Sequence, residues 1–142
     1  MQVREVMNPH VVTIDPAESA ALAARLLARH NIGALPVCSA NGQLQGIVTD
    51  RDIILRCVAP EEDPASIPVK RIMTRQLRTL SPEEDLRQAA WLMASQQIRR
   101  LPVVEKGAVI GVVSLGDLAR CGKYEMEISK ALTEISENVK RV

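Results

Sequence analysis

The chain has 142 residues, of which 46% are hydrophobic and 25% are charged, and these proportions are typical of a folded globular protein. Its formal net charge of +1 gives no general electrostatic attraction to nucleic acid or to an anionic membrane. Phe is absent and there is one Trp and one Tyr, so the core must be aliphatic and lacks the aromatic platforms on which single-stranded nucleic acids stack.

The remaining composition signals concern location and metal binding. No apolar run approaches the roughly 20 residues that span a membrane, and residues 1–7 lack the apolar core of a secretion signal, which predicts a cytoplasmic protein. Cys38, Cys57 and Cys121 are widely spaced and form no CxxC pair. This spacing predicts three reduced side chains rather than a zinc site or a disulfide framework.

An internal repeat organises the chain. Residues 3–7 (VREVM) recur as residues 69–73 (VKRIM), and the same offset of 66 positions pairs Pro36 with Pro102. One residue is lost in a turn, and beyond it the stretch GIVTDRD, which begins at Gly46, is matched by GVVSLGD, which begins at Gly111. We therefore expect a first domain at 1–58, a Pro-rich and acidic linker at 59–68, a second domain at 69–122 and a C-terminal helix at 123–142.

The first copy begins with a β-branched stretch and then a helix start. Asp15 and Pro16 are followed by Glu18, a pattern that predicts a helix N-terminus with Pro in the first turn and a capping box. Apolar residues follow at helical spacing, and two short apolar runs flank Asn41–Gly42, a hairpin signal. The predicted elements are a strand at 11–14, a helix from 15 that includes Leu22, Leu26 and Leu27, strands at 34–38 and 44–49, and a helix at 51–58.

The second copy repeats this order. Ser81 and Pro82 with Glu84 again predict a helix start, and Lys106–Gly107 again predicts a hairpin turn. The predicted elements are a strand at 78–80, a helix that includes Leu86, Ala90 and Met93, strands at 101–104 and 109–114, and a helix at 116–121. The order of strand, helix, strand, strand and helix is therefore written twice, which indicates an α/β (α+β) fold.

These motifs together resemble a tandem pair of CBS domains, named for cystathionine β-synthase. The resemblance covers residues 3–57 and 69–121, and rests on M-x-x-x-V-x-T-I-D-P at 7–16, on IGALPV and IRRLPV at 32–37 and 98–103, and on the two copies of G-x-x-[T/S]-x-x-D. It implies a regulatory or sensory module whose two repeats pack about a pseudo-twofold axis. It also implies adenosine-containing ligands bound in clefts between the repeats, and a homodimer formed through the helices of the CBS domains.

The repeated strand–helix motif has a structural and a functional interpretation. Thr49 with Asp52, and Ser114 with Asp117, satisfy the pattern of a capping box. A Gly within a strand often marks close approach by a ligand or by another backbone, and a carboxylate at a helix start can accept hydrogen bonds from both ribose hydroxyls. The resemblance implies that the Asp residues hold the ribose and that Thr49 and Ser114 lie near the phosphate.

The two copies differ before their LPV strands. The first has Ile32, Gly33 and Ala34, and the second has Ile98, Arg99 and Arg100, so only one copy offers cations to a phosphate. The alternative is that both Arg residues are solvated near a helix C-terminus, where positive charge is favoured. Asp50 adds a negative charge beside Thr49, so the first copy could prefer a less charged ligand or stay empty. The full set of predicted ligand-binding residues is Gly46, Thr49, Asp52, Gly111, Ser114, Asp117, Arg99 and Arg100, with an adenine slot made by Val11, Val12, Ile32, Gly33, Ala34, Leu77, Arg78 and Ile98.

The C-terminal segment has an apolar stripe with helical spacing. This helix could fold back over its own core or pair with its equivalent in another subunit, and the sequence leaves both open, with a slight preference for the second. The stripe comprises Tyr124, Ile128, Leu132, Ile135, Val139 and Val142.

The sequence contains no recognisable catalytic motif. His10 and His30 have no nearby nucleophile and acid that would suggest a triad, and the chain has neither a P-loop nor a GxGxxG motif. We expect a binding module with no required cofactor, whose effector is AMP, ATP, NAD or S-adenosylmethionine and which signals to a protein target. The alternative is a structural or protein-interaction module whose clefts bind no nucleotide.

Overall fold

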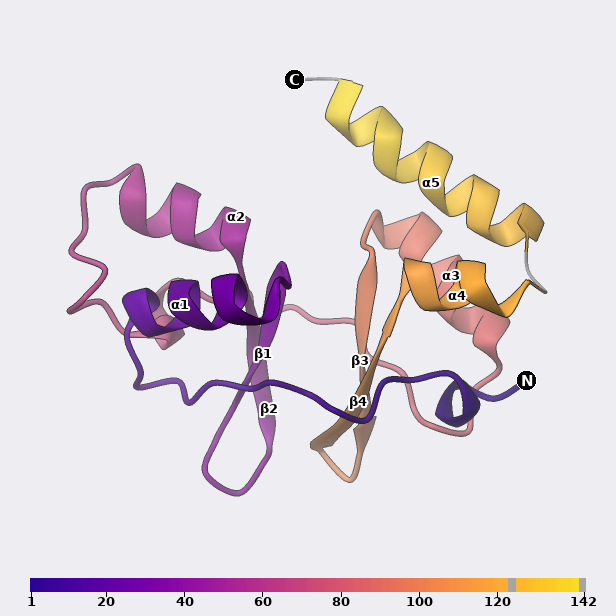
Figure 1. Cartoon of the computed structure of the whole chain (residues 1–142), viewed down its shortest axis with the longest axis horizontal. Coiled ribbons are helices and arrows are strands. Elements are labelled where there is room, and N and C mark those ends of the chain that lie inside the picture. The colour runs from indigo at the N-terminus through magenta and orange to yellow at the C-terminus, as the bar shows by residue number, and fades with distance from the viewer. Residues whose placement is uncertain (123–124, 141–142) are drawn as a thin grey trace. The chain divides into compact units, whose positions relative to one another are not determined.

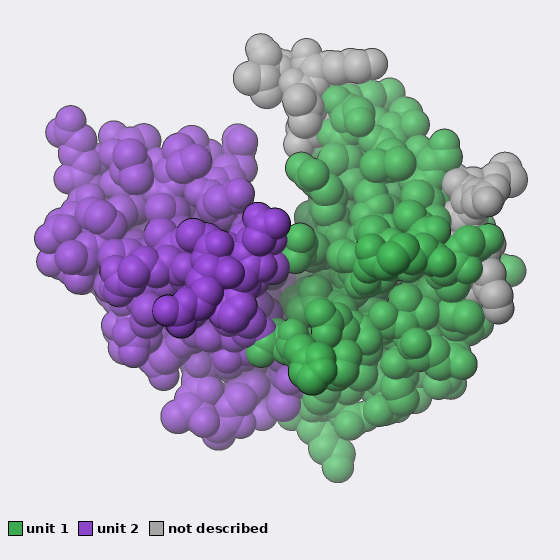
Figure 2. Space-filling view, in the orientation of Figure 1, with its two compact units in different colours: residues 1–11, 78–106, 110–142 green, residues 12–77, 107–109 purple. Residues whose placement is uncertain are grey.

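The computed structural model describes residues 1–122 and 125–140 (Figure 1). The chain forms two compact units, which we call unit 1 (residues 1–11, 78–106 and 110–142) and unit 2 (residues 12–77 and 107–109), as Figure 2 shows. Each unit combines the helices and the hairpin of one copy, which we call the body, with the opening segment of the other copy. The opening segments are residues 1–11, which belong to unit 1, and residues 69–77, which belong to unit 2. The α/β class and the two-repeat architecture predicted from the sequence are therefore confirmed.

Unit 2 holds the body of the first copy. Its strands β1 and β2 pair antiparallel, with a bulge at Val37, and Gly42 adopts a φ of +83° in the turn between them, as the hairpin signal predicts. Its elements are the helix α1 (Ala20–His30), the strands β1 (Ala34–Cys38) and β2 (Leu44–Thr49), the helix α2 (Asp50–Ile53) that continues as the π-helical turn η2 (Ile54–Val58), and the 3-10 helix η3 (Val69–Arg71).

Unit 1 holds the body of the second copy. Its strands β3 and β4 form the second hairpin, whose turn contains Lys106 and Gly107 at positive φ. Its elements are the 3-10 helix η1 (Val3–Glu5), the helix α3 (Leu86–Gln96), the strands β3 (Arg100–Glu105) and β4 (Ala108–Ser114), and the helices α4 (Leu115–Cys121) and α5 (Glu125–Lys140). Residues 107–109, which include the start of β4, belong to unit 2.

The two long helices begin later than the sequence predicts. Ser19 and Asp85 are their N-caps, whereas Asp15 and Ser81 each begin only a turn. Carbonyl groups from distant segments add to these caps. The N–H of Ala20 donates to Ile67 O at 2.9 Å in α1, and the N–H of Leu86 donates to Met1 O at 2.9 Å in α3. The carbonyls of Glu18 and Glu84 accept from Val69 and Val3, so a helix that began at Asp15 or Ser81 would lose these bonds.

The predicted first strand of each copy is reduced to a single bridge. Ile14 pairs in parallel with Val37, and Leu80 pairs in parallel with Val103. The N–H of Ile14 donates to Pro36 O at 3.1 Å, and that of Leu80 donates to Pro102 O at 3.0 Å. The segment 11–14 divides between the two units after Val11, whereas the segment 78–80 lies wholly in unit 1. In both, only the last residue pairs with a hairpin.

The helix α5 packs against its own unit. Ile128 and Ala131 are buried in the same aliphatic cluster as residues of α3, and the side-chain amide of Gln97 donates to Glu134 O at 3.2 Å. Figure 1 shows α5 lying along α3 and α4. Of the predicted stripe, Leu132 is half exposed, the side chain of Val139 is not described, and Tyr124 and Val142 lie outside the described residues. No helix in the described part of the chain is long and apolar enough to cross a membrane.

Candidate functional site

The junction of β4 and α4 in unit 1 carries Ser114 and Asp117. The backbone N–H of Asp117 donates to Ser114 Oγ at 3.1 Å, and the backbone N–H of Ser114 donates to Asp117 Oδ2 at 2.8 Å. The two residues therefore form the capping box that the sequence predicts, and each side chain is fixed in direction. A carboxylate and a hydroxyl are thus presented side by side at a helix start.

The second oxygen of Asp117 has a weaker partner. Asp117 Oδ1 accepts a hydrogen bond from Arg120 Nη2, and the Arg120 side chain is 73% exposed. An ion pair with one partner so exposed contributes little free energy, because water competes for it. Asp117 Oδ1 can therefore exchange Arg120 for a ligand hydroxyl without large cost.

The segment between α3 and β3 lies against this junction. The helix α3 ends at Gln97, which adopts a left-handed φ of 56°, and Ile98 then packs partly against the core of unit 1. The N–H of Leu115, the first residue of α4, donates to the carbonyl of Arg99 at 2.8 Å. The structure therefore brings Ile98, Arg99 and Arg100 next to the residues of the capping box.

Both guanidinium groups are available at this place. Arg99 and Arg100 are exposed, and among the described residues neither side chain makes a hydrogen bond or ion pair. Arginine presents paired donors that match phosphate or carboxylate oxygens. Unit 1 thus combines an acceptor for hydroxyl groups with two free cations.

The equivalent junction of β2 and α2 in unit 2 has the same capping box with more partners. Thr49 and Asp52 exchange two hydrogen bonds of 3.0 Å each. In addition, Thr74 Oγ1 donates to Asp52 Oδ1 at 3.2 Å, and Arg56 Nη1 lies 3.8 Å from the same oxygen. Arg56 is itself held by the carbonyls of Ile72 and Met73, each at 3.1 Å.

Asp52 is consequently engaged on both oxygens by groups of its own unit. It is the one charged or polar residue that is buried in the described part of the chain. The sequence did not indicate the partners Thr74 and Arg56, and it did not indicate Arg120 in unit 1. For Thr74 the only signal was the repeat, since it follows the second copy of the repeated methionine. For Arg56 and Arg120 the signal was their spacing of four and three residues after the Asp on a helix.

The charges beside the two junctions are opposite. In unit 2, the backbone N–H of Asp50 donates to Gly33 O at 3.2 Å, and the Asp50 carboxylate lies 3.8 Å from the position that a Cβ on Gly33 would take. The repeat places Arg99 at the position of Gly33 and Leu115 at that of Asp50. Unit 2 therefore offers a carboxylate where unit 1 offers a guanidinium.

The two strand glycines are approached by a neighbouring segment. A Cβ on Gly46 would lie 2.7 Å from Met73 Sδ and 2.8 Å from Thr74 O, and a Cβ on Gly111 would lie 2.6 Å from Met7 Sδ. Backbone bonds hold these segments in place, since Ile47 pairs with Thr74 and Asn8 pairs with Val112. Of the two alternatives for these glycines, close approach by another backbone is the one that the structure displays.

The residues predicted to form the adenine slot divide between the units. Val11 and Arg78 belong to unit 1 with Ile98, whereas Val12 and Leu77 belong to unit 2 with residues 32–34. Val12 and Ile32 pack partly against the aliphatic cluster of unit 2. Their assignment to a ligand stays a prediction.

Two of the three thiols are held in the protonated form. Burial raises the pKa of Cys38, and it raises that of Cys57, with Glu62 and Asp63 adding to the effect. Cys121 is half-buried, and all three cysteines are free. In residues 1–122 and 125–140, no three His, Cys, Asp or Glu side chains are grouped so that they could hold a metal ion.

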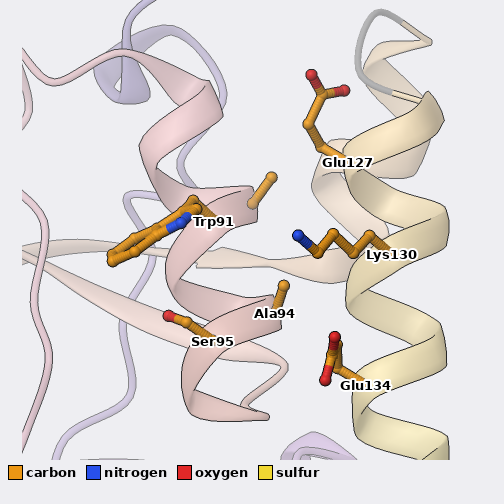
Figure 3. A pocket seen from close by; sticks show the side chains of 7 residues that line it. Trp91, Ala94, Ser95, Glu127, Lys130 and Glu134 are labelled. Carbon is orange, nitrogen blue, oxygen red and sulfur yellow. The ribbon is translucent and has the colours of Figure 1, made fainter.

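A groove between α3 and α5 contains none of the residues predicted to bind a ligand. It has a volume of about 370 Å³, and Figure 3 shows Trp91 on α3 and Lys130 on α5 at its walls. Trp91 is 58% exposed. The remaining residues that line the groove are Ala90, Ala94, Ser95, Glu127 and Glu134.

Both copies of the repeat are similar to known proteins. The family model described as CBS domain matches residues 3–59 and 69–123. The CBS domain-containing protein YhcV of Bacillus subtilis (strain 168) is 41% identical over 134 residues, which covers 94% of each chain. Hypoxic response protein 1 of Mycobacterium tuberculosis (strain H37Rv) is 30% identical over 117 residues, which covers 82% of each chain.

A solved structure is similar in fold and in sequence. The CBS domain pair of protein MJ0100, in complex with 5-methylthioadenosine and S-adenosyl-L-methionine, superposes with a TM-score of 0.76 at 29% identity, and the match covers 86% of this chain and 95% of that one. Both copies of the repeat thus match one family description, and they make up more than half of the chain. The protein belongs to the CBS domain family, as a tandem pair of these domains.

Proposed function

We propose that the protein is a regulatory module that binds an adenosine-containing ligand at the β4–α4 junction of unit 1. Asp117 accepts hydrogen bonds from the ribose hydroxyls, and Ser114 with Arg99 and Arg100 receives the phosphate. The candidate ligands are AMP, ATP, NAD and S-adenosylmethionine, of which the free guanidinium groups favour those that carry phosphate.

The observation that supports this proposal most is the difference in engagement between the two carboxylates. Asp117 Oδ1 is held only by the exposed Arg120, whereas both oxygens of Asp52 are held within unit 2. Proteins built on CBS pairs are regulatory ligand-binding modules, and the similar pair of protein MJ0100 was solved with two adenosine-containing ligands.

Unit 2 has a different preference under this proposal. Asp50 beside Gly33 repels phosphate, and Asp52 must release Thr74 before it can accept both ribose hydroxyls. The β2–α2 junction, which includes Gly46 and Thr49, therefore takes a less charged ligand or none. We extend the proposal to the whole protein as a cytoplasmic homodimer that has no catalytic role, requires no cofactor and passes its state to a protein target.

The test is a thermal-shift panel of AMP, ADP, ATP, NAD and S-adenosylmethionine on nucleotide-stripped protein, with calorimetry on each hit. A ligand at 100 times its dissociation constant adds about 2.7 kcal/mol to the free energy of unfolding, which raises Tm measurably. Asp117→Ala should weaken binding about 10- to 100-fold, since it removes charge-assisted hydrogen bonds.

Arg120→Ala is the matched control for that variant. It removes the present partner of Asp117 but leaves the carboxylate, so the affinity should be retained or increase. If no ligand raises Tm at millimolar concentration, the protein is instead an interaction module whose clefts bind no nucleotide. If a ligand binds equally well to Asp117→Ala, the assignment of the site is wrong.

A further inference from the structure

The only Trp of the chain lies outside the aliphatic core of unit 1. Trp91 is on α3 and is 58% exposed, whereas the buried cluster of this unit consists of Val, Leu, Ala, Met and Ile side chains. Exposure of a large apolar side chain to water is unfavourable, and Trp is enriched among the residues that contribute most to binding at protein interfaces. The exposed Trp91 is therefore a first indication of a contact surface.

Trp91 forms one wall of the groove between α3 and α5. Ala90 and Ala94 also line the groove, and both are buried, so only methyl groups stand where longer side chains would fill it. Figure 3 shows the charged side chains of α5 on the other side of the groove. Small apolar side chains thus lie between an aromatic wall and a charged wall.

The charged wall alternates in sign along α5. Glu127, Lys130 and Glu134 line the groove at intervals of three and four residues, which places one charge on each successive turn of the helix. Within the described residues, none of these three side chains makes a hydrogen bond or an ion pair. Both Glu residues are half-buried, so their carboxylates are partly removed from water without a partner. Such groups favour a partner that supplies the opposite charges.

The groove suits a helix better than the other segments that a partner could present. Both walls are helices, so the groove lacks the row of free N–H and C=O groups to which an extended strand adds. Recognition therefore depends on side chains, and a helix presents its side chains at the same intervals of three and four residues. The two carboxylates disfavour nucleic acid and anionic lipid, which are both negatively charged.

We propose that the groove between α3 and α5 binds an amphipathic helix of another protein. That helix places an apolar side chain against Trp91 and Ala94, and it carries a basic, an acidic and a basic residue on successive turns opposite Glu127, Lys130 and Glu134. The inference gives a docking surface to the protein target of the proposed function. It rests on that proposal only for the existence of a target, because no residue of the ligand site lines the groove.

The first test uses the full chain and two synthetic helical peptides without Trp. Both peptides present the same apolar face, and beside it one carries Lys, Glu and Lys on successive turns while the other carries Glu, Lys and Glu. Because Trp91 is the only Trp of the chain, its fluorescence reports binding at the groove. The first peptide should bind and change this emission, and the second should bind at least about tenfold more weakly, since it places like charges together.

Reversal of the charges of the groove should reverse this preference. The triple variant Glu127→Lys, Lys130→Glu and Glu134→Lys should bind the second peptide at least about tenfold more tightly than the first. The matched control is Glu61→Lys, which changes the net charge by the same amount at an exposed position of unit 2 and should keep the wild-type preference. Circular dichroism checks that both variants fold.

The apolar part of the contact is tested separately by calorimetry. Trp91→Ala should weaken binding of the first peptide at least about tenfold, because it removes the aromatic wall. Leu132→Ala is the matched control, since Leu132 is 50% exposed on α5 and does not line the groove, and it should leave the affinity unchanged. Asp117→Ala should bind the peptide as the wild type does, so failure of the proposed ligand site is distinguishable from failure of this contact.

Four results would overturn the proposal. The first is no binding of the first peptide at millimolar concentration, and the second is equal affinity of the wild-type chain for both peptides. The third is a preference that the triple variant does not reverse. The fourth is an emission of Trp91 that depends on the concentration of the wild-type chain alone, which would assign the groove to a second copy.

Discussion

The two strand–helix junctions have the same backbone and the same capping box, and they differ in what surrounds the carboxylate. In unit 2, Asp52 is bound by Thr74 and approached by Arg56. In unit 1, Asp117 is bound by Arg120, which is mostly exposed. Both copies of the repeat thus keep the capping box. The partners Thr74 and Arg56 tie Asp52 into the fold, whereas Asp117 can exchange Arg120 for another partner.

The comparison predicts its largest relative difference in stability loss between the two Asp residues. Asp52→Ala should lower the free energy of unfolding by about 2 kcal/mol, because it removes a buried acceptor from the partly buried Thr49 N–H and Thr74 hydroxyl. Asp117→Ala should cost only about 1 kcal/mol, the typical cost of losing a cap. Urea denaturation of both variants measures the difference, and equal losses would mean that Thr74 and Arg56 do not stabilise Asp52.

The next largest difference in stability is expected between Ala substitutions at the two strand glycines, because a neighbouring backbone approaches Gly46 more closely than Gly111. A Cβ on Gly46 would lie 2.8 Å from the Thr74 carbonyl, whereas on Gly111 it would lie 3.2 Å from the Asn8 carbonyl, with a flexible Met side chain closer in both cases. A methionine can move more easily than a paired backbone carbonyl. We expect Gly46→Ala to cost about 2–3 kcal/mol and Gly111→Ala about 1–2 kcal/mol. Thermal unfolding of the two variants checks this order, and the reverse order would contradict it.

The charge difference predicts a smaller effect, seen in ligand affinity. Replacing both Arg99 and Arg100 by Ala should weaken binding of a phosphate-bearing ligand about tenfold, because two free guanidinium groups are lost. The control is the double substitution Arg25→Ala and Arg29→Ala, which removes an exposed pair of Arg residues from α1. Calorimetry with ATP compares the two variants. Equal affinity in both would show that the Arg residues of unit 1 are only solvated.

The smallest predicted effect concerns pH. Burial raises the pKa of Cys38 and Cys57 above the ordinary value of 9.0, so the folded state holds these thiol protons more tightly than the unfolded state does. The associated stability is fully present below pH 9 and is lost as the pH rises through the folded pKa values. The Tm should therefore fall above about pH 9, and less so in a Cys57→Ala variant relative to its own value at pH 7. A decline that is identical in both proteins would exclude Cys57 as the cause.

Local signals in the sequence were sufficient for the features whose partners lie close along the chain. Both capping boxes join residues three positions apart, and both hairpin turns depend on a Gly with positive φ. The predicted helix starts at Asp15 and Ser81 were wrong. The helices begin instead at Ala20 and Leu86, whose N–H groups donate to the carbonyls of Ile67 and Met1, far away along the chain.

Distance along the chain also explains why the sequence did not predict Thr74 as a partner of Asp52. The backbone pairing that brings Thr74 to Asp52 crosses from the opening segment of the second copy to the body of the first, and such a contact leaves no periodic pattern in the sequence. The sequence did place a Gly in each strand where a neighbour approaches closely. It did not distinguish a ligand from the backbone of Asn8 or Thr74.

We propose that unit 1 binds an adenosine ligand through Asp117, whereas Asp52 in unit 2 stabilises the fold. Calorimetric titration of ATP into stripped wild-type protein and into Asp117→Asn tests it most directly, because Asn preserves the size of the side chain and an acceptor for the Ser114 N–H. We expect one site per wild-type chain and at least about tenfold weaker binding in the variant. Undiminished affinity in Asp117→Asn, with its Tm unchanged, would contradict it.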